Sequence, residues 1–208
     1  LKQGDLLMAS TYLTRTPSSS GNRKTFTFSF WFKRSSLSSN QVIYNQYNSS
    51  NGYNSFIGFN SNNTFVIWDY TNAYQLNLRT NRLFRDVNAW YHAVIAVDTT
   101  QATASNRAKL YINGVQETSF SPATYPSQNL DLRVNEYQPQ QIGVFRYGST
   151  NADFFDGSMS YVAFVDGTAE LPTIFGETDS VTGQWKIKTD ITPSVAWGTN
   201  GFLILKNG

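Results

Sequence analysis

The sequence predicts an all-β fold, a sandwich of two antiparallel sheets, from three observations. Residues 25–32 alternate strictly and place phenylalanines 26, 28, 30 and 32 on one face, as in a half-buried strand. Residues 90–98 are apolar on both faces, which indicates a strand in the middle of a sheet that is covered on both sides. Residues 108–115 end in Asn113-Gly114, which is favoured in a type I′ hairpin turn because both central positions need positive φ.

Shorter strands and loops are expected around these segments. Residues 121–139 contain Pro122, Pro126 and Pro139 and are expected to be irregular, whereas residues 173–176 are expected to form a short helical turn. A glycine, Gly157, begins the main part of a late strand within residues 154–166. Further strands are expected at residues 12–15, 41–45, 55–59, 64–69, 74–79, 141–145, 185–187 and 202–205.

Composition narrows the classes of function. The 208 residues suit one sandwich domain, and 16 Lys and Arg against 14 Asp and Glu provide no clustered basic charge for nucleic acid. No apolar run is long enough for a transmembrane helix, so membrane insertion is not expected. Cysteine is absent, which leaves the compartment open. Because the chain begins with Leu1, we expect further chain on at least one side.

Several segments, in this order, resemble the laminin-G-like and concanavalin A-like jelly-roll family. They are Thr11–Pro17 leading into Phe28–Arg34, the Trp90-Tyr91-His92 strand, the Leu110-Tyr111-Ile112-Asn113-Gly114 hairpin and the late segment 154–166. The resemblance implies a two-sheet antiparallel jelly roll in which the late strand returns near the first. We therefore expect a sandwich over residues 1–172 and a C-terminal tail over residues 173–208, which packs on the sandwich or on a neighbouring subunit.

The tail is similar to segments of laminin-G-like structural proteins of tailed phages, particularly marine ones. The matching pieces are residues 175–185 and 197–202. This resemblance implies a non-enzymatic structural or adhesion domain on the virion surface, in a tail fibre, a tail-associated protein or a capsid-surface protein. The implied partners are other virion subunits, a homo-oligomer and host-surface glycans. The alternative is a carbohydrate-binding or adhesive module of a secreted bacterial protein.

Catalytic chemistry is not expected. His92 is the single histidine and lies within a core strand, so a structural role is favoured over a catalytic triad, and a zinc site is close to excluded. Glucanases of this fold use a Glu-x-Asp-x-x-Glu strand. The nearest segment here begins with Glu177 and Asp179, but it has Thr182 in place of the third carboxylate and lies in the polar tail. A glycoside hydrolase is thus a minor alternative.

Calcium is the one cofactor that the pattern leaves open. Domains of this family often hold calcium at a sheet rim with carboxylate, amide and carbonyl oxygens. The candidates are Asp98, Asn151, Asp153 and Asp156. The alternative is a set of solvated turns with Asx caps, and the absence of a dense Asp-x-Asp-x-Asp loop predicts at most a weak site.

Aromatic and amide side chains gather in two neighbouring segments, residues 44–53 and 68–74. A sugar has an apolar face and a rim of hydroxyls, so an exposed aromatic platform beside hydrogen-bonding groups is typical of a glycan site. The same residues can instead cover the edges of the core. The glycan candidates are Tyr44, Tyr47, Tyr53, Trp68, Asp69, Tyr70, Asn72 and Tyr74.

Two further expectations concern the core and the basic residues. Arg79, Arg82 and Arg85 form a modest basic run, interpreted as a solvated face or a contact with an acidic partner subunit. The predicted core consists of Phe28, Phe30, Trp90, Val94, Ile95, Leu110, Ile112 and Val162.

Overall fold

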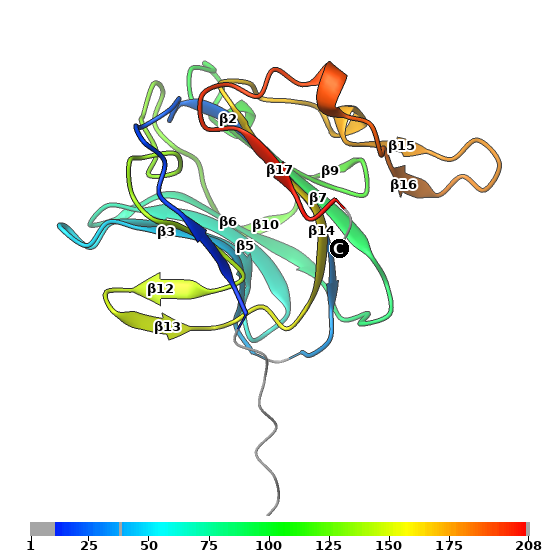
Figure 1. Ribbon diagram of the computed structural model, residues 1–208, viewed down its shortest axis with the longest axis horizontal. Helices are drawn as coiled ribbons and strands as arrows, with labels where there is room; N and C mark the ends of the chain where they lie inside the picture. The colour runs from blue at the N-terminus through cyan, green and yellow to red at the C-terminus, as the bar shows by residue number, and fades with distance from the viewer. Residues whose placement is uncertain (1–10, 38, 207–208) are drawn as a thin grey trace, which may run out of the picture.

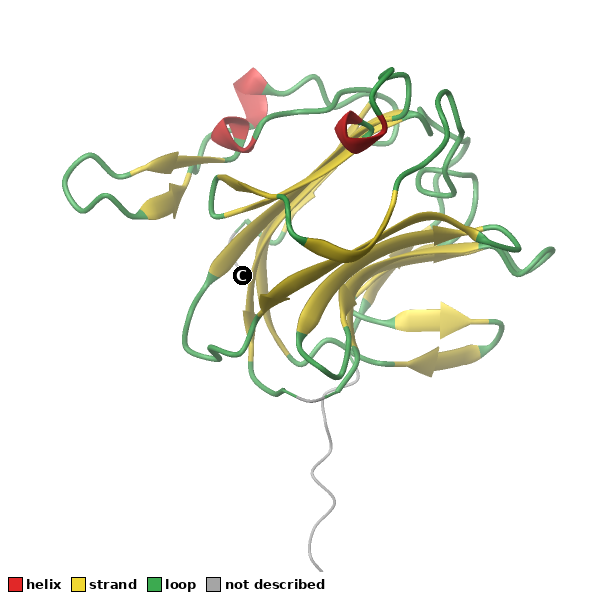
Figure 2. Cartoon of the chain, turned by 180° about the vertical axis from the view of Figure 1, so that it is seen from behind, coloured by secondary structure: helices red, strands yellow, loops and turns green. Residues whose placement is uncertain are grey.

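The computed structural model describes residues 11–37 and 39–206, and they form a sandwich of two large antiparallel sheets (Figures 1 and 2). The seven-stranded sheet has the spatial order β1 (Leu13–Arg15), β11 (Gln140–Ile142), β3 (Gln41–Tyr47), β4 (Asn54–Phe59), β5 (Thr64–Tyr70), β6 (Tyr74–Leu83) and β10 (Phe120–Thr124). The six-stranded sheet has the order β17 (Phe202–Ile204), β14 (Gly157–Asp166), β2 (Thr25–Arg34), β7 (Tyr91–Asp98), β8 (Ala108–Ile112) and β9 (Val115–Glu117).

Two small hairpins and three single helical turns complete the described chain. The hairpins are β12 (Phe145–Tyr147) with β13 (Thr150–Ala152), and β15 (Gly176–Thr178) with β16 (Trp185–Ile187). The 3₁₀ turns are η1 (Ala104–Asn106), η2 (Pro172–Ile174) and η3 (Thr192–Ser194). The turn expected near residue 173 is therefore confirmed as η2. Within residues 11–37 and 39–206, no helix has the length and apolarity needed to cross a membrane.

The main core lies between the two sheets. The four phenylalanines of β2 point inward and are at most 2% exposed, and Ile95 of β7 is 1% exposed beside them. The type I′ turn is also confirmed, because Asn113 and Gly114 have φ of 49° and 81°. The predicted core residues are all buried except one: Trp90 immediately precedes β7 and is 43% exposed, so its inclusion was wrong.

The outer face of the six-stranded sheet has its own apolar layer. Val94 and Ala96 of β7 point away from the main core. They pack with Phe175, Ile191 and Val195 of the C-terminal segment, residues 173–206. The prediction that β7 is covered on both sides is therefore confirmed. Residues 173–206 contribute this cover and also supply β17, which pairs with β14 as an edge strand of the sheet.

A hydrogen-bonded aromatic cluster joins the C-terminal segment to the sheet. The imidazole of His92 stacks on Trp31, with ring centroids 4.8 Å apart. Trp185 Nε1 of β16 donates a hydrogen bond to His92 Nδ1 at 3.0 Å. A Cβ added at Gly114 would lie 2.6 Å from the Trp185 ring, so the hairpin turn needs glycine both for its φ and for this close approach.

The structure differs from the expected strands mainly in short elements. Residues 121–139 were expected to be irregular, yet β10 enters that region and pairs with β6 through an irregular register. The strands β9, β12, β13 and β15 were also not predicted, and each has three residues. Three residues are too few for an alternating pattern to be recognised. The pairing of such short strands is set by hairpin geometry and tertiary contacts instead.

Candidate functional site

The outer face of the seven-stranded sheet carries a row of aromatic and polar side chains. Strand register places Asn45, Phe56, Trp68, Asn77 and Thr124 side by side on successive strands from β3 to β10. Their neighbours Ile57, Ile67 and the leucines at 76 and 78 belong to the main core. Because successive side chains alternate between the faces of a sheet, the row itself points away from the core.

A shallow groove of about 350 Å³ lies on this outer face. Trp68 of β5 and Tyr74 of β6 supply its aromatic surface, and Tyr74 is 50% exposed. Asn77 and Arg79 of β6 supply hydrogen-bonding groups. The complete lining is Asn60, Val66, Trp68, Tyr74, Asn77 and Arg79. The groove thus combines a ring surface with amide and guanidinium donors.

The Trp68 indole is held by rings on several sides. Phe56 stacks on it almost in parallel, at 5.2 Å between centroids and 2° between planes. Tyr74 and Phe145 approach edge-on at 6.0 and 6.4 Å, and Phe145 comes from the β12–β13 hairpin. Such contacts restrict the indole. A ligand that stacks on it therefore loses little binding free energy to the ordering of this side chain.

Arg79 is also held in place. Its Nε donates a hydrogen bond to the Ser121 carbonyl of β10 at 2.9 Å. The basic run predicted from the sequence is therefore divided: Arg79 lines the groove, whereas Arg82 forms an ion pair with Glu117 at 3.2 Å. Sequence reasoning missed Asn77 and Arg79 as site residues. Their alternation with Leu76 and Leu78 was the available signal.

The predicted glycan residues fall into several groups. Trp68 and Tyr74 line the groove, and Tyr70 packs against Tyr74 at 5.3 Å between centroids. Tyr47 packs against Tyr147 of the β12–β13 hairpin at 4.9 Å. A third group is formed by Asn72, which donates a hydrogen bond to the Tyr53 hydroxyl at 2.9 Å.

Tyr44 and Asp69 are buried and cannot belong to a surface platform, so their inclusion was wrong. Each is 1% exposed. Tyr44 packs on Phe28 in the main core at 4.5 Å. Asp69 follows Trp68 directly, and two consecutive strand residues cannot share a face. Asp69 Oδ2 accepts the backbone N–H of Arg133 at 2.6 Å, and burial raises the pKa of this carboxyl to about 7.

The four calcium candidates do not form one site. Asp98 pairs with Thr25 at one end of β2, whereas Asp156 immediately precedes Gly157, which pairs with Arg34 at the other end. Nine residue steps at about 3.3 Å separate the two ends by roughly 30 Å. The carboxylate of Asp98 accepts hydrogen bonds from Thr100 and Gln101. Across the described ranges, no three His, Cys, Asp or Glu residues are grouped to hold a metal ion.

The residues considered for catalysis have structural roles. His92 Nδ1 accepts from Trp185, so the proton is on Nε2, which lies 2.8 Å from Ser29 Oγ and donates to it. Burial lowers the pKa of His92 to about 3. Asp179 Oδ1 accepts the backbone N–H groups of Val181 and Thr182 and thereby closes the β15–β16 turn.

Comparison with known families agrees with this architecture. The family model described as the concanavalin A-like lectin/glucanases superfamily matches residues 8–174. The chain belongs to this superfamily. Among curated proteins, none is significantly similar to it.

Solved structures with the same fold are distant in sequence. A SAP-like pentraxin of Limulus polyphemus has a TM-score of 0.54 and 14% identity, over 76% of this chain and 70% of the pentraxin. A putative carbohydrate binding protein of Bacteroides ovatus has a TM-score of 0.54 and 16% identity, over 78% of this chain and 42% of that protein. The CBM40 of the Ruminococcus gnavus IT-sialidase, bound to α2,3-sialyllactose, has a TM-score of 0.51 and 12% identity, over 76% of this chain and 92% of the CBM40 chain. These similarities establish the fold of this superfamily member.

Proposed function

We propose that this superfamily member is a non-enzymatic carbohydrate-binding, adhesive module that holds glycans on the outer face of its seven-stranded sheet. The observation that carries the proposal is the Trp68 indole, immobilised by Phe56 and placed in a groove with Asn77 and Arg79. A sugar ring stacks its apolar face on such an indole, while its hydroxyls exchange hydrogen bonds with amide and guanidinium groups.

The structural relatives support the same class of function. One is a carbohydrate binding module in complex with sialyllactose, and another is described as a putative carbohydrate binding protein. Arg79 adds a positive charge that favours sugars carrying a carboxylate, because guanidinium groups bind carboxylates in a bidentate manner. The groove lining contains no carboxylate, so it lacks the paired acids that glycoside hydrolysis requires.

A glycan array probed with the whole chain tests the proposal. The best glycan is then titrated against Trp68→Ala and Trp90→Ala, two exchanges of the same kind, because Trp90 is exposed outside the groove. We expect Trp68→Ala to weaken binding by about tenfold or more, as for an aromatic anchor, and Trp90→Ala to leave it unchanged.

Arg79→Gln provides a second variant that leaves the aromatic packing in place. Weaker binding by this variant, with an unchanged melting temperature, supports the groove. Equal binding by the parent, Trp68→Ala and Arg79→Gln contradicts the assignment of the site. Release of reducing sugar from a bound glycan contradicts the non-enzymatic assignment.

We further propose that the setting is the surface of a tailed-phage virion, where the domain contacts other virion subunits as part of a homo-oligomer. This proposal is supported by the resemblance of residues 175–185 and 197–202 to phage structural proteins. An antiserum against the domain is expected to label intact particles. A secreted bacterial protein recovered free of particles would instead favour the alternative setting.

A further inference from the structure

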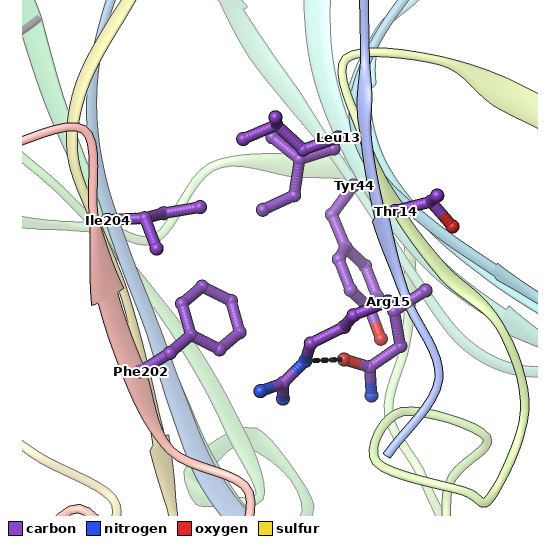
Figure 3. Close-up of a pocket in the computed structure, with 8 residues that line it drawn as sticks. Leu13, Thr14, Arg15, Tyr44, Phe202 and Ile204 are labelled. Atoms are coloured by element: carbon purple, nitrogen blue, oxygen red, sulfur yellow. Dashed lines mark hydrogen bonds between the residues drawn. The ribbon is translucent and has the colours of Figure 1, made fainter.

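A second pocket lies at the open side of the sandwich, away from the outer-face groove. β1 ends the seven-stranded sheet and β17 ends the six-stranded sheet, and the two strands face each other across a cavity of about 280 Å³ (Figure 3). In Figure 3, Leu13 and Arg15 extend from β1 toward Phe202 and Ile204 of β17. A cavity therefore separates the two edge strands over part of this side of the sandwich.

The walls of this edge pocket are mainly apolar. Leu13, Ile142 and Ile204 supply aliphatic surface, and the rings of Phe202 and Tyr44 lie on opposite sides of the pocket (Figure 3). Leu13 is 44% exposed at the rim. Such walls offer few partners for sugar hydroxyls, but they gain about 25 cal/mol for each Å² of apolar ligand surface that they cover.

Among the described residues of the lining, Arg15 is the single one with a charged side chain. Its Nε donates to Gln140 Oε1 at 2.9 Å, its Nη2 donates to the Asn200 carbonyl, and its guanidinium carbon lies 4.4 Å from the Phe202 ring centroid. Within residues 11–37 and 39–206, neither an ion pair to Arg15 nor a hydrogen bond from its Nη1 is found.

Both oxygens of the nearby Asp166 carboxylate accept hydrogen bonds from other residues. Its Oδ1 accepts from the Asn22 backbone at 2.7 Å and from Asn135 Nδ2 at 2.7 Å, and its Oδ2 accepts from the Asn200 backbone at 3.0 Å. Burial lowers the pKa of Arg15, with Tyr44 and Asp166 opposing that effect. Arg15 is thus a fixed, partly desolvated cation beside an apolar cavity, with a donor left for an anion.

We propose that the edge pocket binds a small amphipathic carboxylate, with its apolar body between β1 and β17 and its carboxylate on the Arg15 guanidinium. The cavity of about 280 Å³ is nearly twice the size of an apolar cavity of about 150 Å³ that holds benzene. This size suits a medium-length alkyl chain or an aryl carboxylate. Charge complementarity at Arg15 selects the acid over the corresponding alcohol.

Calorimetric titration of the whole chain with decanoate, below its micelle concentration, tests the proposal, with 1-decanol as the neutral probe. We expect decanoate to bind the parent more tightly than decanol. Arg15→Gln should weaken decanoate binding by about tenfold through loss of a charge-assisted hydrogen bond, and should leave decanol binding unchanged. Arg82→Gln is the matched control, because Arg82 lies outside the pocket lining.

Ile204→Trp should block both probes by filling the cavity, and Arg15→Lys should retain part of the preference for the acid. If Arg15→Gln does not fold, Ile204→Trp and the difference between acid and alcohol in the parent still decide the matter. The proposal is overturned by equal affinity for decanoate and decanol, by undiminished binding to Ile204→Trp, or by a dimer in light scattering that Ile204→Trp disrupts.

Discussion

The His92 imidazole is neutral in the folded protein because both ring nitrogens have partners and burial disfavours a charge. Its folded pKa of about 3 lies below the ordinary value of 6.5, so the unfolded chain binds the proton more readily. Stability from this group is complete above pH 6.5 and is lost as the pH falls toward 3. We expect His92→Gln to reduce that loss by about 1.4 kcal/mol per pH unit, measured by urea unfolding.

The same variant also tests whether His92 is separate from the groove. A folded His92→Gln protein should bind glycans as the parent does, since His92 is buried on the six-stranded sheet and the groove lies on the other sheet. Loss of glycan affinity without loss of fold would contradict this separation.

Asp69 has the opposite pH dependence. Burial raises its folded pKa from 3.8 to about 7, so the folded state retains a proton that the unfolded state releases. Its contribution to stability is present below pH 3.8 and declines as the pH rises to 7. Asp69→Asn should therefore gain stability relative to the parent as the pH rises through this window, by about 1.4 kcal/mol per pH unit at most. A constant difference between the two proteins would exclude this titration.

At the scale of single residues, the sequence predicted which residue types form the groove better than it predicted which way their side chains point. Trp68 and Tyr74 were predicted as aromatic surface and lie in the groove, whereas the adjacent Asp69 points into the core. Strict alternation would have separated Trp68 from Asp69. Tyr44 was harder to place, because a register shift between Val42 and Tyr44 interrupts the alternation of β3.

At the scale of elements, the C-terminal segment behaves as part of the sandwich. Phe175, Ile191 and Val195 are buried against the outer face of the six-stranded sheet, and β17 extends that sheet. Deleting residues 177–208 should therefore lower the melting temperature strongly or prevent folding, because it exposes this layer and the pocket side of the core.

A shorter deletion provides the control for that experiment. Replacing residues 179–184 by Asn-Gly removes only the end of the projecting β15–β16 hairpin, where Val181 is 91% exposed (Figure 1). This change should alter the melting temperature little. A truncated 1–176 protein as stable as the parent would show that the segment serves another subunit instead.

Elements with long alternation were predictable, and those fixed by tertiary contacts were not. β7 was correctly placed as a strand covered on both sides, but the identity of its outer cover was not evident from residues 90–98. The partners lie some 80 or more residues further along the chain, at Phe175, Ile191 and Val195. The β12–β13 hairpin, which positions Phe145 beside Trp68, has too few residues to show a period.

At the scale of the whole molecule, stability depends on the phenylalanine-rich layer between the sheets. Ile95 is 1% exposed at its centre, so Ile95→Ala should cost about 2–5 kcal/mol through the cavity that it leaves. Val115→Ala is the control, since Val115 is 67% exposed and should change stability by at most about 0.5 kcal/mol. Denaturant unfolding compares them, and similar values for both would refute the central position of β7.

The contact of Trp185 with His92 gives the protein an intrinsic optical probe. Indole emission shifts to longer wavelength when the ring moves from a hydrogen-bonded, partly buried position into water, and a neighbouring imidazole alters its intensity. The sequence has five tryptophans, and Trp185 is the one whose N–H bonds to His92 across the junction between the C-terminal segment and the sheet. The difference between the emission spectra of the parent and Trp185→Phe therefore reports, without any label, whether that segment is seated on its sheet.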